Sequence, residues 1–70
     1  RAYIEDGVLH AGYLFKEVRV PLKDIGKISY KDEEYTVYGK GGDPLCAMNG
    51  KLTGIGDVVH ELDVQGVPFV

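Results

Sequence analysis

Apolar and polar positions alternate along much of the first two thirds of the chain. The segment 17–20 reads Glu-Val-Arg-Val, and this period of two is typical of a strand with one apolar and one polar face. Pro21 follows directly, and because proline has no N–H, it ends the strand or places it at a sheet edge. The pattern therefore predicts a short, half-buried strand that stops near Pro21.

Turn-forming residues divide the rest of this region into further short strands. Asp6-Gly7 stands between two apolar runs, which is the strongest short hairpin signal. The segment 21–26 predicts a bend, 31–34 a polar turn, and 39–44 a Gly-rich loop. Between these breaks, the alternation and the β-branched and aromatic residues predict further strands: 2–4, 8–13, 25–30, 35–38 and 45–48.

The apolar period changes to that of a helix after residue 50. Apolar side chains recur at helical spacing on one face, and they predict a helix over 53–65. We expect Thr53 to cap its start through a side-chain hydrogen bond. Asp57 falls early, where the helix dipole favours negative charge, and Gly66 suits the left-handed position just after the end.

These elements predict a mainly β (α+β) fold in a single domain, 1–70. We expect a small antiparallel bent sheet or partly open barrel of five or six strands, capped by one C-terminal helix. No strand–helix–strand unit is present, so a parallel sheet is not expected. The predicted core consists of apolar residues from both halves: Ile4, Leu9, Val18, Val20, Leu22, Ile25, Ile28, Val37, Ile55, Val59 and Leu62.

Three segments together resemble bacterial pleckstrin-homology-like (PH-like) domains. They are the hairpin Ile4–Leu9, the joint Val20–Ile28 with its Pro-Leu-Lys-Asp-Ile core, and the helix end at Gly66–Phe69. The resemblance implies a bent barrel with a helix over one mouth. The family has about seven strands, so it also implies that N-terminal strands are cut off or that this is a shorter relative. A sheet shortened in this way has an open edge that invites pairing between chains.

Composition and charge narrow the classes of function. The chain has 70 residues and a net charge of −3, which disfavours nucleic acid as a partner because such binding needs a cationic face. One cysteine excludes an intrachain disulfide, and no apolar run approaches the roughly 20 residues of a membrane span. The resemblance implies a bacterial cytoplasmic location, at the inner face of the membrane where such domains are attached to membrane segments.

Few residues are candidates for catalysis or metal binding. Cys46 has no basic neighbour to lower its thiol pKa, which favours a structural role. His10, His60 and Cys46 could supply three metal ligands, but no spacing supports that site. The Gly-rich loop lacks the phosphate-binding pattern, and adjacent carboxylates at 32–34 are typical of a solvated turn. We therefore predict no catalytic residue, no metal and no cofactor.

Basic residues are concentrated between positions 16 and 31. Five of the eight fall there, so the segment has a local charge of +3. It is either an ordinary solvated face or a contact surface for anionic lipid, where each basic residue adds about 1 kcal/mol. Tyr35 and Tyr38 lie on opposite faces of one strand, which places one tyrosine on the surface, where tyrosines suit interfaces. The candidate lipid or partner contacts are Lys16, Arg19, Lys23, Lys27, Lys31, Tyr35 and Tyr38.

The sequence thus predicts a non-catalytic protein-interaction or self-assembly module. Its expected partner is a second copy or the remainder of a longer parent chain, bound through strand edges and an aromatic or apolar patch. The alternative is binding to a membrane surface through the basic segment 16–31. An enzyme would require His10, His60 and either Cys46 or Asp57 to converge in one pocket.

Overall fold

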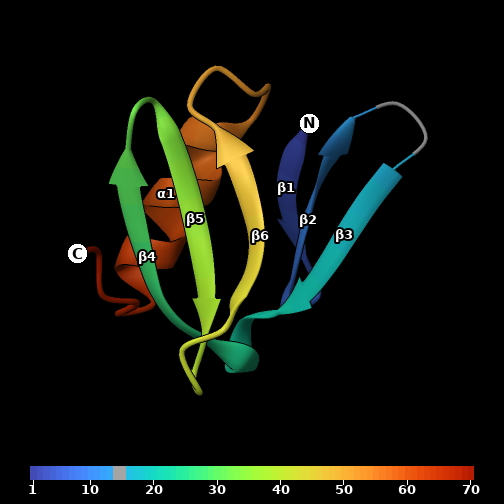
Figure 1. The fold of residues 1–70 in the computed structure, drawn as a ribbon. Helices are drawn as coiled ribbons and strands as arrows, with labels where there is room; N and C mark the ends of the chain where they lie inside the picture. The colour runs from blue at the N-terminus through green and yellow to red at the C-terminus, as the bar shows by residue number, and fades with distance from the viewer. Residues whose placement is uncertain (14–15) are drawn as a thin grey trace.

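The computed structural model describes residues 1–13 and 16–70, which form six strands followed by one helix (Figure 1). The strands form two three-stranded antiparallel sheets with the orders β1-β2-β3 and β4-β5-β6. The sheets are not closed into a barrel, and the predicted fold class is confirmed. The elements are β1 (Ala2–Glu5), β2 (Val8–Tyr13), β3 (Lys16–Pro21), β4 (Ile25–Lys31), β5 (Glu34–Gly39), β6 (Pro44–Asn49) and α1 (Ile55–Val64).

Two tight hairpins set the register within the sheets. Asp6 and Gly7 have φ values of 52° and 75° and join Glu5 to its partner Val8, so the predicted Asp-Gly turn is confirmed. The turn between β4 and β5 has the same form, because Asp32 and Glu33 have φ values of 53° and 63°. Two-residue turns with positive φ match the natural twist of strands.

A short 3-10 turn, Leu22–Asp24, connects the two sheets. It occupies the predicted bend and redirects the chain from β3 into β4 (Figure 1). Figure 1 also shows that β3 diverges from β6 toward its Lys16 end. The inner face of β3 therefore separates from the second sheet toward Lys16.

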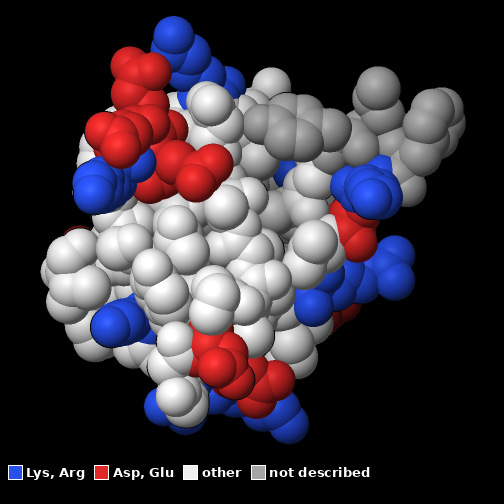
Figure 2. Space-filling view, viewed as in Figure 1, with Lys and Arg blue, Asp and Glu red and all other residues white. Residues whose placement is uncertain are grey.

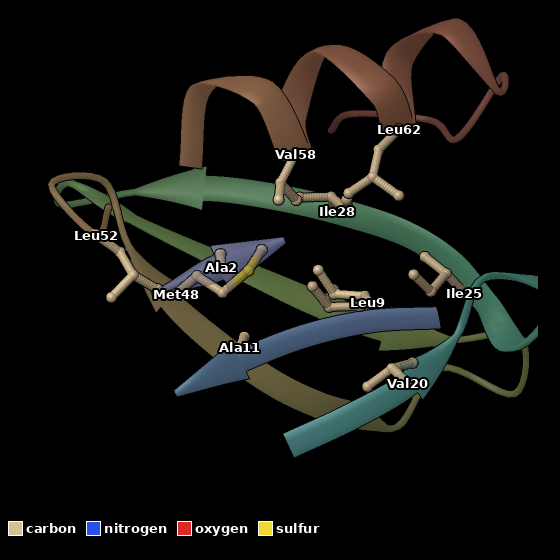
Figure 3. Close-up of a cluster of buried hydrophobic side chains, with 11 residues drawn as sticks. Ala2, Leu9, Ala11, Val20, Ile25, Ile28, Met48, Leu52, Val58 and Leu62 are labelled. Carbon is tan, nitrogen blue, oxygen red and sulfur yellow. The ribbon is translucent and has the colours of Figure 1, made fainter. Parts of the chain in front are cut away.

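The core lies between the sheets and α1 (Figure 3). Val58 and Leu62 project from α1 toward Ile28 of the second sheet. The buried apolar residues are Ala2, Leu9, Ala11, Val20, Ile25, Ile28, Val37, Met48, Leu52, Val58 and Leu62. Six of the predicted core residues are among them, while Ile4, Leu22 and Ile55 are partly buried against the cluster.

Two core predictions are wrong. Val18 is 44% exposed, because it lies toward the end of β3 where the sheets diverge. On α1 the inward position is Val58 rather than Val59, which is only half-buried. Ile55, Val58 and Leu62 are spaced by three and four residues and therefore share one helix face.

The helix starts two residues later than predicted, and Thr53 does not cap it. The cap position is Gly54 with φ 88°, and no side chain donates or accepts a capping hydrogen bond there. The carbonyl of Thr53 instead accepts a hydrogen bond from the Ala2 N–H at 2.8 Å. At the other end Gly66 has φ 85°, so the predicted left-handed position is confirmed.

The segment after α1 returns to the second sheet. Ile28 N–H donates to the Pro68 carbonyl at 2.9 Å, and Val70 N–H donates to the Ile28 carbonyl at 2.8 Å. These bonds make one parallel bridge between Ile28 and Phe69. Within the described residues, no helix has the length and apolar character needed to cross a membrane.

Candidate interaction surface

Four strands lie at sheet edges, and two of these edges, those of β1 and β4, are bonded to other segments of the chain. On β1, the Ala2 N–H is taken by Thr53, and Gly54 lies so close that a Cβ there would be 2.2 Å from the Ala2 carbonyl oxygen. On β4, the tail at Phe69 covers Ile28. The β6 strand lies against β2. Edge strands are common sites of pairing with other chains. An edge bonded to another segment of the same chain is less available for such pairing.

The outer side of β3 has no such neighbour among the described residues. Its only strand partner there is β2, and Figure 1 places β3 at the outer margin of the molecule. We call the outer side of Lys16–Pro21 the free edge. Figure 1 shows no described element that continues the first sheet beyond it.

The register of β3 shows which backbone groups face the free edge. Leu22 N–H donates to the Gly7 carbonyl at 2.9 Å, which continues the β2–β3 register. Hydrogen-bonded pairs alternate in an antiparallel ladder, so Val18 and Val20 also bond to β2. The N–H and C=O groups of Glu17 and Arg19 therefore point outward and offer two donors and two acceptors to an added strand.

An apolar groove runs beside the free edge. It has a volume of about 450 Å³ and lies between β3 and the β5–β6 loop. Val18 and Leu45, which are 44% and 39% exposed, line it. Arg19, Asp24 and Lys40 also line it and supply charges of both signs. A strand added to β3 would place alternate side chains over this groove.

The polar face of β3 carries an ordered cluster with β1 and β2. His10 Nδ1 donates to Glu17 Oε1 at 2.8 Å, and Arg19 Nε donates to the same oxygen at 3.2 Å. The ring of Tyr3 stacks on His10 with centroids 4.5 Å apart and planes 2° apart. The His10 side chain is only 16% exposed. Glu17 and His10 therefore hold each other on the outer face of the first sheet.

This cluster changes the acidity of Glu17. The hydrogen bond from His10 lowers the pKa of the Glu17 carboxyl below its ordinary value of 4.5, and Arg19 lowers it further. Partial desolvation opposes them by raising it. Because an anion is favoured here, Glu17 is a charged group at neutral pH and the hydrogen between it and His10 resides on the imidazole.

The predicted basic contacts are divided between two sheets. Lys16 and Arg19 belong to β3, Lys23 lies in the 3-10 turn, and Lys27 and Lys31 belong to β4. Figure 2 shows Lys and Arg in separate groups around the margin of this view, with an uncharged area in the middle. The five residues are all exposed, but they follow two differently directed strands.

The two predicted tyrosines have different surroundings. Tyr35 packs against the core, and its ring lies 4.4 Å from that of Tyr30. Tyr38 points to the opposite face of β5, where Lys27 Nζ lies 5.1 Å from its ring centroid. That distance suits a cation–π contact. Val37 shares the face of Tyr35 and is buried. The two tyrosine rings therefore lie on opposite faces of β5.

The sequence pattern does not reveal two features of this surface. The pattern predicts only a strand at Leu45, which lines the groove, and it does not indicate that His10 pairs with Glu17. The alternation of 17–20 carried a signal, because it placed Glu17 and Arg19 on one polar face next to a proline. That alternation does not show which strand pairs with β3 or whether its outer side is covered.

The residues considered for catalysis or metal binding lie apart. His10 is on the outer face of the first sheet, Cys46 packs against the core from β6, and His60 is exposed on α1. In residues 1–13 and 16–70, no three His, Cys, Asp or Glu side chains are grouped to hold a metal. Burial raises the pKa of the Cys46 thiol above its ordinary value of 9.0, which disfavours the thiolate needed for nucleophilic attack.

Comparisons with known proteins find no relative of this chain. No family model matches the chain, and neither the curated proteins nor the solved structures give a match. The resemblance to PH-like domains therefore stays a prediction.

Proposed function

We propose that this chain is a non-catalytic protein-interaction module whose contact surface is the free edge of β3 and the groove beside it. The observation that carries the proposal is the contrast between this edge and the covered edges of β1 and β4. Outward N–H and C=O groups at Glu17 and Arg19 give backbone affinity for an extended segment, and the groove supports recognition of its side chains. Pro21 has no N–H, so it limits the length of the added ladder.

The membrane alternative has weaker support. Lipid attraction depends on several basic side chains reaching the same anionic surface. Lys27 lies over Tyr38 on the second sheet, while Arg19 is bonded to Glu17 on the first. Lipid binding by the segment 16–31 stays a prediction, and the free edge is the preferred surface.

Photo-crosslinking from within the groove tests the proposal. A benzoylphenylalanine is placed at Val18, which is exposed beside the free edge, and in a matched control at Val64, which is 67% exposed on α1. We expect the Val18 position to capture one defined polypeptide segment, identified by mass spectrometry, and the Val64 position to capture little.

A backbone variant decides whether the captured segment pairs with the edge. Arg19→Pro removes an outward N–H without removing a bond to β2, whereas Arg19→Ala keeps that N–H. Capture should fall with the proline variant and survive with alanine. Equal capture at Val18 and Val64, or capture insensitive to Arg19→Pro, would contradict the proposal.

A further inference from the structure

The order of charges along β3 is complementary to itself. Glu17 and Arg19 both point their backbone groups outward, and Val18 lies midway between them. When two copies of such a strand run antiparallel about Val18, Glu17 of each copy faces Arg19 of the other. We propose that the occupant of the free edge is β3 of a second copy of this chain, paired antiparallel about Val18. This inference rests on the proposed function and names its partner.

The backbone geometry independently selects the same register. Among the described residues of β3 (Lys16–Pro21), Glu17 and Arg19 offer both an outward donor and an outward acceptor, so hydrogen-bonded pairs within this strand join these two positions. With Val18 at the two-fold axis, Glu17 of each copy pairs with Arg19 of the other copy. Each of these two pairs makes two N–H to C=O hydrogen bonds. The result is four hydrogen bonds and a continuous six-stranded sheet, a symmetric interface of the common two-fold type.

Neighbouring registers are disfavoured by charge. A shift of two residues in one direction puts Glu17 opposite Glu17, and the same shift in the other direction puts Arg19 opposite Arg19. Like charges directly opposite each other destabilise a strand pair. A shift of one residue would place a residue with outward backbone groups opposite a residue whose backbone groups are already bonded to β2. The register about Val18 is therefore the one that both the charges and the hydrogen-bonding pattern allow.

Side chains on the inner face fit this arrangement. Val18 occupies a non-hydrogen-bonded position, where the two Cα atoms approach to about 4.5 Å. The two valines would therefore bury each other at the axis. This explains why the chain has an apolar residue, 44% exposed, at a site that its own core does not reach. Leu45, on the far side of the groove, extends the apolar surface.

The contact is small, so the dimer should dissociate on dilution in the micromolar range. Sedimentation equilibrium of the whole chain, from about 10 μM to about 1 mM, measures this dissociation. Glu17→Arg and Arg19→Glu each place like charges opposite one another twice. Each single change should weaken dimerisation by at least about tenfold.

The double variant Glu17→Arg with Arg19→Glu restores opposite charges across the axis. It should return the dissociation constant to within about threefold of the unmodified chain. Since the double variant also lacks the His10–Glu17 hydrogen bond, this rescue separates pairing from loss of that bond. Asp63→Arg on α1 makes the same change in net charge as Glu17→Arg, but away from β3, and should leave dimerisation unchanged.

A second variant keeps the test informative if charge reversal disturbs the fold. Val18→Lys changes an exposed side chain and brings two ammonium groups together at the axis, so it should yield a monomer with an unchanged circular dichroism spectrum. A monomer at every concentration for the unmodified chain would overturn the inference, as would a dimer that ignores these substitutions. If such a monomer still captures another protein from Val18, the second-copy partner is wrong while the proposed function stands.

Discussion

The edges of β4 and β3 differ in what covers them. At β4, Ile28 is bonded on its outer side by Pro68 and Val70, so the chain completes that edge with its own tail. At β3, the outward groups of Glu17 and Arg19 meet no described strand. A protein that must avoid uncontrolled pairing covers or blunts its edges, and the proposed interaction rests on this one edge left open beside an apolar groove.

The open edge also carries protections that the covered edge does not need. Pro21 closes one end of β3, and charged Glu17 and Arg19 occupy its exposed face. These features restrict pairing to strands of matching length and charge. Cover and charge both limit unwanted strand pairing, but only charge leaves the edge available to a partner strand.

The largest effect is expected from disturbing the contact that covers the edge of β1. Gly54→Ala adds a Cβ 2.2 Å from the Ala2 carbonyl oxygen at a residue with φ 88°. We expect it to lower the free energy of unfolding by about 1–3 kcal/mol, measured by urea denaturation. Gly56→Ala is the matched control, because its Cβ would meet nothing within 4 Å.

That control should change stability in the opposite direction. Alanine favours a helix over glycine by about 0.5–1 kcal/mol, so Gly56→Ala should raise the free energy of unfolding. If both variants lose stability equally, close contact between Gly54 and β1 is not what holds this edge.

A smaller effect is expected from uncovering β4. Val70→Pro removes the N–H that donates to the Ile28 carbonyl, at a cost of about 1 kcal/mol. Val70→Ala keeps this N–H and should change stability little. Amide hydrogen exchange of Ile28 reports the local opening: it should accelerate in the proline variant and remain slow with alanine. Equal exchange in both would show that the tail does not protect this edge.

The smallest effect concerns the charges of β3. Because the folded pKa of Glu17 lies below its ordinary value of 4.5, its contribution to stability is fully present above that value. The contribution is lost as the pH falls through the folded pKa. Glu17→Gln should therefore be less stable than the unmodified chain at neutral pH, and the difference should shrink below about pH 4.5.

Urea midpoints measured between about pH 7 and about pH 3, at one low protein concentration, check this expectation. His10→Phe keeps an aromatic ring beside Tyr3 but removes the donor that lowers the pKa of Glu17. It should reduce the pH dependence in the same acidic range. A stability difference that grows on acidification would contradict the assignment.

Local features of the fold were readable from sequence because their causes are local. Asp6-Gly7 specifies its hairpin through φ preferences, and the alternation at 17–20 assigned Glu17 and Arg19 to one face. The prediction for Val18 was wrong because periodicity identifies a face but not whether another sheet covers it. Thr53 was a plausible cap, but its carbonyl is used by Ala2, which is 51 residues away in the sequence.

The candidate surface was only partly predictable for the same reason. The residue pattern alone accounts for the strands, for their polar and apolar faces, and for the self-complementary order of Glu17, Val18 and Arg19. The tertiary structure alone decided which edges are covered, because cover depends on contacts between distant segments, such as Ile28 with Phe69. The contrast between the free edge of β3 and the bonded edges of β1 and β4 is therefore visible only in the folded chain.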